Sequence, residues 1–284
     1  MNGLRRSSHY FSVFVVALLA AACARAERIV SIGGDVTEIV YALGAQDRLV
    51  ACDTSSIYPA AAEALPKVGY MRSVAAEGIL SLKPDLVIAN ALSGPPSALQ
   101  QVRAIGVKVE TIDATPDIHS VPAKIRQVAK VLGADARGEQ LATQYETALA
   151  AVEKQQSAYA PRVLFVLNHA GGAQVAGRET AADAILRSSG ARNVLTDFSG
   201  YKPMGGEAII AADPEVILLT EQGLEQAGGI DGVLRMPGVA QTSAGRARRI
   251  YAQDALLMLG IGPRTPQLLI SLQALWRQLP AGGR

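Results

Sequence analysis

The sequence predicts an α/β protein with two Rossmann-like lobes, each built on a parallel sheet, joined by a long rigid helix, with a ligand cleft between the lobes. Three observations lead to this fold class. Short β-branched runs alternate with helical stretches in both halves of the chain, a helical region without strand signal separates the halves, and one block of sequence occurs twice. With 49% hydrophobic and 18% charged residues, the chain can form a globular core.

The first lobe is expected at residues 27–135. A strand at 28–32 is followed by a helix that opens at Asp35 and ends at Gly44. Further strands are expected at 48–52, 85–89 and 108–112, with helices at 75–81 and 96–104. Strands that alternate with helices in this way indicate a parallel sheet covered by helices.

The connector is expected at residues 136–160, after a first helix at 121–132. It is rich in Ala, Gln, Glu and Leu, and Pro161 ends it. The second lobe, residues 161–284, resumes with strands at 162–167, 216–219 and 249–252. A helical connector holds two lobes at a fixed spacing, whereas a Gly/Ser linker would let them move freely.

The repeated block begins at Glu77 in the first lobe and at Glu207 in the second. In both copies Pro stands seven positions after Glu, an acid follows the Pro, an apolar strand comes next, and Gly-Tyr precedes the Glu. Each copy predicts a loop, a short helix, a turn and a buried strand. Glu in a first helical turn also favours the helix dipole, which explains both acids without a function.

Residues 1–26 are expected to be a secretory signal peptide, with a basic start, an apolar run and Ala24-Arg25-Ala26 as the cleavage site. The alternative is a lipoprotein acylated at Cys23. Cleavage after Ala26 leaves 24 basic and 25 acidic residues, a net charge of −1, so the sequence gives no sign of nucleic-acid binding. Cys52 is then the single cysteine, and a small buried hydrophobe is its expected role.

Enzyme motifs are missing from the sequence. There is no P-loop, no G-x-S-x-G and no H-E-x-x-H, and the expected mature chain holds only two histidines, His119 and His169. Bare zinc or manganese would normally require more His or Cys ligands. The sequence therefore predicts an exported receptor for a small molecule and no enzyme.

Several motifs resemble the periplasmic binding proteins of ABC importers, in the helix-linked class that carries haem, cobalamin and ferric siderophores. They are R-I-V-S-I-G-G-D-V-T-E-I-V-Y-A-L-G at 28–44 and the V-G-Y-M-R block from Val68. Within this class the chain is similar to the haem (hemin) carriers through G-Y-M-R at 69–72, A-G-R-E-T-A-A-D-A-I-L at 176–186 and G-P-R-T-P at 262–266.

The resemblance implies a periplasmic receptor that binds one or two ferric haem b molecules. It would deliver haem to an inner-membrane ABC permease dimer with its ATPase, downstream of an outer-membrane haem receptor. The alternative is a cobalamin or ferric-siderophore carrier of the same class. Cobalamin pockets of this class tend to be rich in tryptophan, and Trp276 is the only tryptophan here.

The same resemblance implies that Tyr70 is the axial ligand of the haem iron. Phenolate is a hard anionic ligand that suits Fe(III). Arg72 is the candidate for stabilising that phenolate, or it pairs with a haem propionate. A loop aromatic that packs on its own lobe is the alternative interpretation of Tyr70.

Other site residues are implied in the same way. His169 follows a strand of the second lobe and is a candidate second ligand, and Tyr201 is another. Arg178 and Arg264 are candidates for the propionates, because a guanidinium fork matches a carboxylate. Glu77 and Glu207 match the acids by which such proteins dock on permease arginines.

Overall fold

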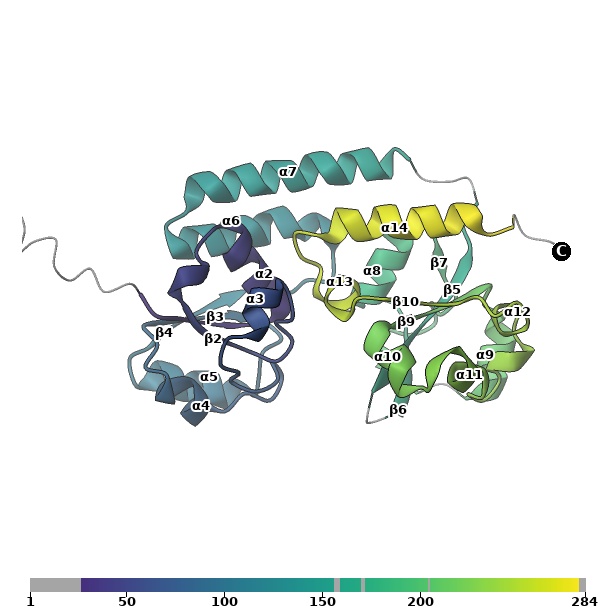
Figure 1. Ribbon diagram of the computed structural model, residues 1–284, viewed down its shortest axis with the longest axis horizontal. Coiled ribbons are helices and arrows are strands. Elements are labelled where there is room, and N and C mark those ends of the chain that lie inside the picture. Colours follow the sequence, from purple (N-terminus) through teal and green to yellow (C-terminus); the bar gives the residue numbers. More distant parts are fainter. Residues whose placement is uncertain (1–26, 156–158, 170–171, 204, 281–284) are drawn as a thin grey trace, which may run out of the picture.

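The computed structural model describes residues 27–155, 159–169, 172–203 and 205–280, and it shows two α/β lobes beneath a layer of long helices (Figure 1). The expected leader, with the cleavage site at Ala26 and the acylation site at Cys23, lies outside the described residues. Within the described ranges no helix is long and apolar enough to cross a membrane.

The N-terminal lobe is a four-stranded parallel sheet in the order β2-β1-β3-β4. Strands β1 and β3 are completely buried, as their β-branched sequences predict. The strands are β1 (Ile29–Ile32), β2 (Leu49–Cys52), β3 (Leu86–Asn90) and β4 (Lys108–Ile112). The helices are α2 (Gly34–Ala42), α3 (Ala60–Glu63), α4 (Ala76–Ser81) and α5 (Pro96–Ala104).

Two helices connect the lobes, α6 (Val121–Leu132) and α7 (Asp135–Glu153). Gly133 ends α6 in the left-handed conformation, with φ at 66°, which glycine adopts without steric cost. Gly138 lets α7 turn back closely over α6, because a Cβ at this position would clash with the side chain of Ala129. The long connector expected from the sequence is therefore a helical hairpin.

The C-terminal lobe has a six-stranded sheet in the order β10-β9-β5-β6-β8, with β7 beside the start of β5. Its strands are β5 (Arg162–His169), β6 (Gly172–Ala176), β7 (Arg192–Asn193), β8 (Tyr201–Lys202), β9 (Val216–Thr220) and β10 (Ile250–Gln253). Its helices are α8 (Ala181–Ser188), α9 (Gly206–Ala212), α10 (Glu221–Gln226), α11 (Gly229–Leu234), α12 (Ser243–Arg246), α13 (Ala255–Gly260) and α14 (Thr265–Gln278).

The two lobes share one topology. The parallel strands β7-β5-β9-β10 repeat the order β2-β1-β3-β4, with α9 leading into β9 as α4 leads into β3. The C-terminal sheet is mixed, however, and not purely parallel as the sequence predicted. Strand β6 returns directly from β5 as a hairpin, and so short a connection can join only antiparallel strands.

A buried ionic network holds the N-terminal lobe, the connector and the C-terminal lobe together. The Nζ of Lys124 on α6 lies 2.7 Å from Oδ2 of Asp35 on α2 and donates to the carbonyl of Ile261, after α13, at 3.2 Å. The amide of Asn90 donates to both oxygens of the same carboxylate. One hydrophobic core cluster also contains residues of both lobes. The lobes are therefore fixed at their junction on the side of the long helices.

Candidate functional site

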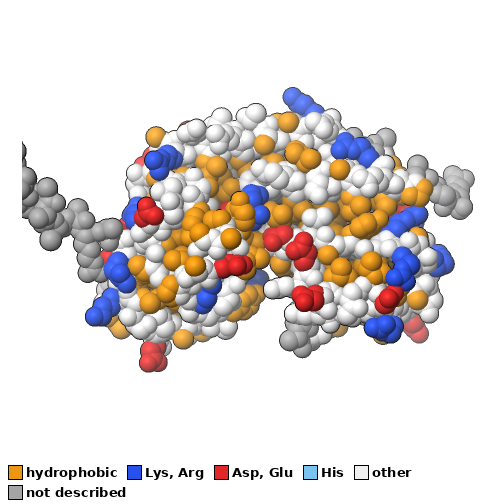
Figure 2. All heavy atoms as spheres, in the orientation of Figure 1, with side chains coloured by type: hydrophobic (Ala, Val, Ile, Leu, Met, Phe, Trp, Pro, Cys, Tyr) orange, Lys and Arg blue, Asp and Glu red, His pale blue; other side chains and the backbone are white. Residues whose placement is uncertain are grey.

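The surface is hollowed between the two lobes, on the side away from α7 and α14 (Figure 2). Ligands of open α/β sheets bind at the carboxyl ends of the strands. Residues that follow β1 and β2 meet at this edge of the N-terminal sheet, where the N–H of Gly33 donates to Asp53 at 2.8 Å. The loops at this edge and those across the hollow are therefore the candidate site.

Tyr70 lies on a loop fixed to the carboxyl end of β2. Residues 66–69 run beside that strand, since the N–H of Val68 donates to Cys52 and the N–H of Thr54 donates to Gly69. Gly69, with φ at 100°, then redirects the chain. The N–H of Ser73 closes the turn on the carbonyl of Tyr70 at 2.7 Å.

The loop after β3 holds this turn from the other side. The N–H of Gly94 donates to the carbonyl of Met71 at 2.8 Å, and the N–H of Val74 donates to the carbonyl of Gly94 at 2.9 Å. The side chain of Met71 packs on the N-terminal core. Tyr70 nevertheless remains 48% exposed. A fixed backbone thus presents a phenol that the protein does not cover.

Tyr201 lies in β8 of the other lobe and pairs with Ala176 of β6. Its ring packs on the hydrophobic core, and burial raises the pKa of its phenol to about 12. The Thr180 hydroxyl, the positive charge of Arg72 and the N–H of Ala182 each partly oppose that rise in pKa. The charge of Arg72 therefore reaches across from the N-terminal lobe to Tyr201.

Arg264 is engaged within the protein. Its backbone N–H donates to Oε1 of Glu38 on α2 at 3.2 Å, and its Nη2 donates to Oε2 at 3.0 Å. Its guanidinium also stacks on the ring of Tyr58, 3.4 Å from the centroid. Burial raises the pKa of Glu38, and the contacts with Arg264 partly offset that rise. The guanidinium therefore links the C-terminal lobe to the N-terminal lobe.

The remaining predicted residues lie on separate elements of the two lobes. Arg178 is exposed, and its backbone bridges to the strand-like segment at Ser199. His169 is the last residue of β5 and pairs with Gly172, and its side chain lies outside the described part of the structure. Glu77 and Glu207 are exposed at the starts of α4 and α9, and neither forms a hydrogen bond or ion pair with a described residue.

Sequence reasoning missed Glu38, Tyr58 and the Asp35–Lys124 pair. The sequence does contain an indication, because Asp35 and Glu38 lie one turn apart in a helix whose other residues, apart from Thr37, are apolar. Acids on a buried helical face require cationic partners. Which cations would meet them could not be inferred, since Lys124 and Arg264 are 89 and 226 residues away from the acids they contact.

A family model described as periplasmic binding protein matches residues 29–256, so the chain belongs to the periplasmic binding protein family. The role of this family is binding and transport of a ligand and not catalysis. The family places the protein in the periplasm or elsewhere outside the cytoplasm. Both conclusions agree with the expectations drawn from the sequence.

Within this family, the chain is similar over most of its length to solved structures of heme-binding proteins. The periplasmic heme-binding protein RhuT from Roseiflexus sp. RS-1, in apo form, is 45% identical over 88% of this chain and 98% of its own, with a TM-score of 0.86. The periplasmic heme-binding protein BhuT in complex with two hemes is 45% identical over 88% and 97%, with a TM-score of 0.83. A vitamin B12-binding protein from Vibrio vulnificus is 28% identical over 92% of this chain and 93% of its own.

Proposed function

We propose that this protein binds ferric haem in the hollow between its lobes and delivers it to an inner-membrane ABC importer. One observation carries the proposal: the exposed phenol of Tyr70 stands on a loop fixed at the carboxyl edge of the N-terminal sheet, with Arg72 two residues further on. The similarity to two heme-binding proteins over most of the chain supports the same ligand.

Tyr70 is the proposed ligand of the haem iron. Its phenol is exposed, whereas burial makes ionisation of Tyr201 difficult, and an iron ligand must lose its proton. Arg72 lies in the same turn and would stabilise the phenolate. The structure thus favours Tyr70 over Tyr201 as the anionic ligand on chemical grounds.

Arg178 is the better candidate for a propionate, and Arg72 is the alternative if it does not stabilise the phenolate. Both side chains are exposed, whereas Arg264 already holds Glu38 and stacks on Tyr58. His169, at the end of β5, remains the candidate ligand for a second haem. Two haems are bound in the BhuT structure, and a second haem here would require a second ligand.

Titration of the purified mature protein with hemin, followed at the Soret band, tests the proposal. We expect saturable binding and a tyrosinate-type spectrum. Tyr70→Phe should lose that spectrum and bind at least about tenfold more weakly, since more than about 1.4 kcal/mol of iron coordination is lost.

Tyr58→Phe is the matched control for this substitution, because Tyr58 is the other strongly exposed tyrosine among the described residues and Phe retains the ring on which Arg264 stacks. It should bind hemin as the wild type does. An unchanged spectrum in Tyr70→Phe would exclude Tyr70 as the ligand. The end point of the wild-type titration gives the number of haems.

A cobalamin carrier is the second candidate, because vitamin B12-binding proteins are among the relatives. Trp276 offers it no support. The indole is buried on α14 and donates to the hydroxyl of Ser189 at 3.0 Å, so it cannot line the hollow. Binding of cyanocobalamin without binding of hemin would replace the first proposal by this one.

We also propose that Glu77 and Glu207 dock on the two subunits of the permease, which works with its ATPase. They are equivalent in the internal repeat, exposed and unpaired with any described residue, so both carboxylates are available to basic partners. The double variant Glu77→Ala, Glu207→Ala should bind hemin normally and reduce haem uptake. Undiminished uptake would refute the docking role.

The proposal also covers how the protein is exported and which protein supplies its haem. Residues 1–26 are proposed to direct export and to be removed after Ala26, with acylation at Cys23 as the alternative. An outer-membrane haem receptor would supply the haem. Mass spectrometry of the mature N-terminus distinguishes the two kinds of processing.

A further inference from the structure

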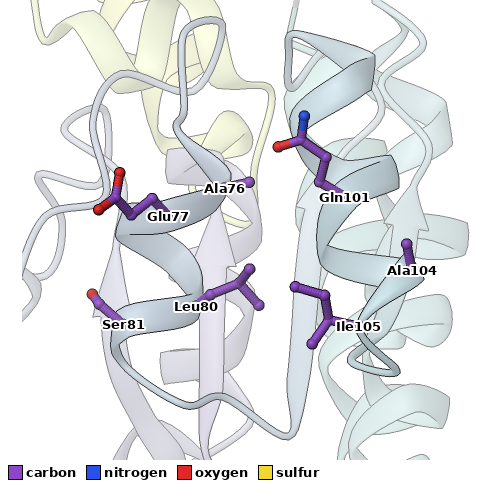
Figure 3. A pocket seen from close by; sticks show the side chains of 7 residues that line it. All are labelled: Ala76, Glu77, Leu80, Ser81, Gln101, Ala104 and Ile105. Carbon is purple, nitrogen blue, oxygen red and sulfur yellow. The ribbon is translucent and has the colours of Figure 1, made fainter.

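A groove runs between α4 and α5 on the outer side of the N-terminal lobe, next to Glu77 (Figure 3). Its volume is about 650 Å³, and its lining is mostly apolar. Leu80 on α4 and Ile105 at the end of α5 point toward each other across it, while Glu77 projects from the other flank of α4. Ile105 is 69% exposed, the highest value among the exposed large hydrophobic side chains described.

The surface of α4 on the side of the acid away from the groove is bare, because successive helical residues lie about 100° apart and place Gly78 and Leu80 on opposite sides of Glu77. Gly78 follows Glu77, and a Cβ placed on it would meet no atom within 4 Å. Glycine is unfavourable inside a helix, so folding alone gives no reason for it here. A missing side chain at this point lets a partner's backbone approach α4 closely beside Glu77, while Leu80 faces the groove on the other side of the acid.

The C-terminal lobe repeats this arrangement on α9. Glu77-Gly-Ile-Leu80 corresponds to Glu207-Ala-Ile-Ile210. Ile79 and Ile209, two residues after the acids, are buried against their lobes. Ile210 is exposed although it is a large hydrophobic residue. Both helices lie on the sides of their lobes away from α7 and α14 (Figure 1). The same short pattern of acid, small residue, buried anchor and outward apolar residue is thus presented twice.

From this pattern we infer that each docking acid is one half of a two-part contact whose other half is the apolar residue one turn further on. The inference rests on the proposed docking function and extends it. The occupant is the same periplasmic segment on each of the two permease subunits. That segment carries a basic side chain for the Glu and, beside it, an apolar side chain that enters the α4–α5 groove in one lobe and covers Ile210 in the other.

Charge and shape both select this occupant. Glu77 is the only charged residue among those that border the groove, and its carboxylate lies on the adjoining flank of α4. An acidic partner would leave this carboxylate unpaired, and a purely polar partner would leave the apolar lining in contact with water. The groove is open to solvent, which suits a protruding side chain of a large partner.

Two variants test the contact without touching the haem site. Ile105→Ser removes apolar surface from the groove, and Gly78→Phe places a ring on the bare face of α4. The controls are Ile270→Ser on α14, where Ile270 is 52% exposed, and Ala151→Phe on the exposed face of α7. All four proteins should bind hemin with wild-type affinity.

Binding to the ABC importer of the source organism, reconstituted with its ATPase in lipid nanodiscs, gives the readout. We expect Ile105→Ser to weaken the complex about tenfold and Gly78→Phe to weaken it further, while both controls stay within about twofold. Growth of a strain lacking the wild-type protein on hemin as iron source should follow the same order.

The outcomes separate the inference from the function on which it rests. If Glu77→Ala and Gly78→Phe weaken the complex and Ile105→Ser does not, the acid docks and the apolar half of the contact is wrong. If none of the three substitutions weakens it, the docking role of α4 itself is wrong. If hemin does not bind to the wild type, the haem function fails, and the nanodisc experiment still decides the docking surface.

Discussion

Removing the ammonium group of Lys124 should destabilise the whole protein, although Lys124 lies far from the proposed ligand. Lys124 and Asp35 are 2% and 3% exposed and lie 2.7 Å apart. Lys124→Met keeps much of the side-chain volume, leaves the Asp35 carboxylate without its cation and removes the hydrogen bond to the carbonyl of Ile261. Breaking a buried pair in this way costs about 3–5 kcal/mol.

The assay is thermal and urea unfolding of the apo protein. For a protein of this size each kcal/mol lowers the melting temperature by about 2–4 °C, so a fall of about 6–20 °C is expected. Lys130→Met is the matched control, since Lys130 is an exposed lysine of the same helix, and its change should stay within about 0.5 kcal/mol.

A double variant examines the physical reason for the loss. Asp35→Leu combined with Lys124→Met removes both charges, and paired apolar replacements of buried ion pairs are often neutral or stabilising. Most of the loss should therefore be recovered. A loss below about 1 kcal/mol in Lys124→Met, or a double variant as unstable as the single one, would refute the view that an uncompensated charge is the cause.

Two further predictions concern groups buried near the same junction. Tyr145→Phe should lower the free energy of unfolding by about 1 kcal/mol, because the buried hydroxyl donates to the carbonyl of Ile118 at 2.8 Å; equal stability by urea unfolding would contradict this. Burial raises the pKa of Glu38 above its ordinary 4.5, so its contribution to stability is complete below that pH and declines as pH rises through the folded-state pKa. The stability of the wild type relative to Glu38→Gln should therefore fall as pH rises above 4.5, and parallel pH profiles would show that Glu38 does not titrate in this way.

Most of the regular elements could be predicted from local pattern. The helix expected at 121–132 is α6 with the same bounds, and the strands of the N-terminal sheet lie within a residue or so of their expected positions. These elements have apolar residues at the period of their secondary structure, and glycines or prolines at their ends. The short strands β6 and β8 lack an apolar run, so no pattern indicated them.

The sequence also located the candidate site in outline. Tyr70, Arg72 and both docking acids could be selected because two short motifs, G-Y-M-R and the repeated Glu-to-Pro block, contain them. The structure then distinguished between candidate ligand-binding residues that the sequence could not place in order of preference. Arg264 is held by Glu38, and Tyr201 is largely buried, whereas Tyr70 stays exposed.

The amino-acid sequence by itself determined the two-lobed α/β architecture, the helical connector and the internal repeat. Each depends on the spacing of apolar residues, and on glycines and prolines at the ends of elements, within a few tens of residues. Only the tertiary structure decided how the lobes join. The contacts of Asp35 with Lys124 and of Glu38 with Arg264 link segments that lie far apart in the chain. Electrostatic partners of this kind are set by distance in space, which becomes defined only when the cores of both lobes have packed on the connecting helices.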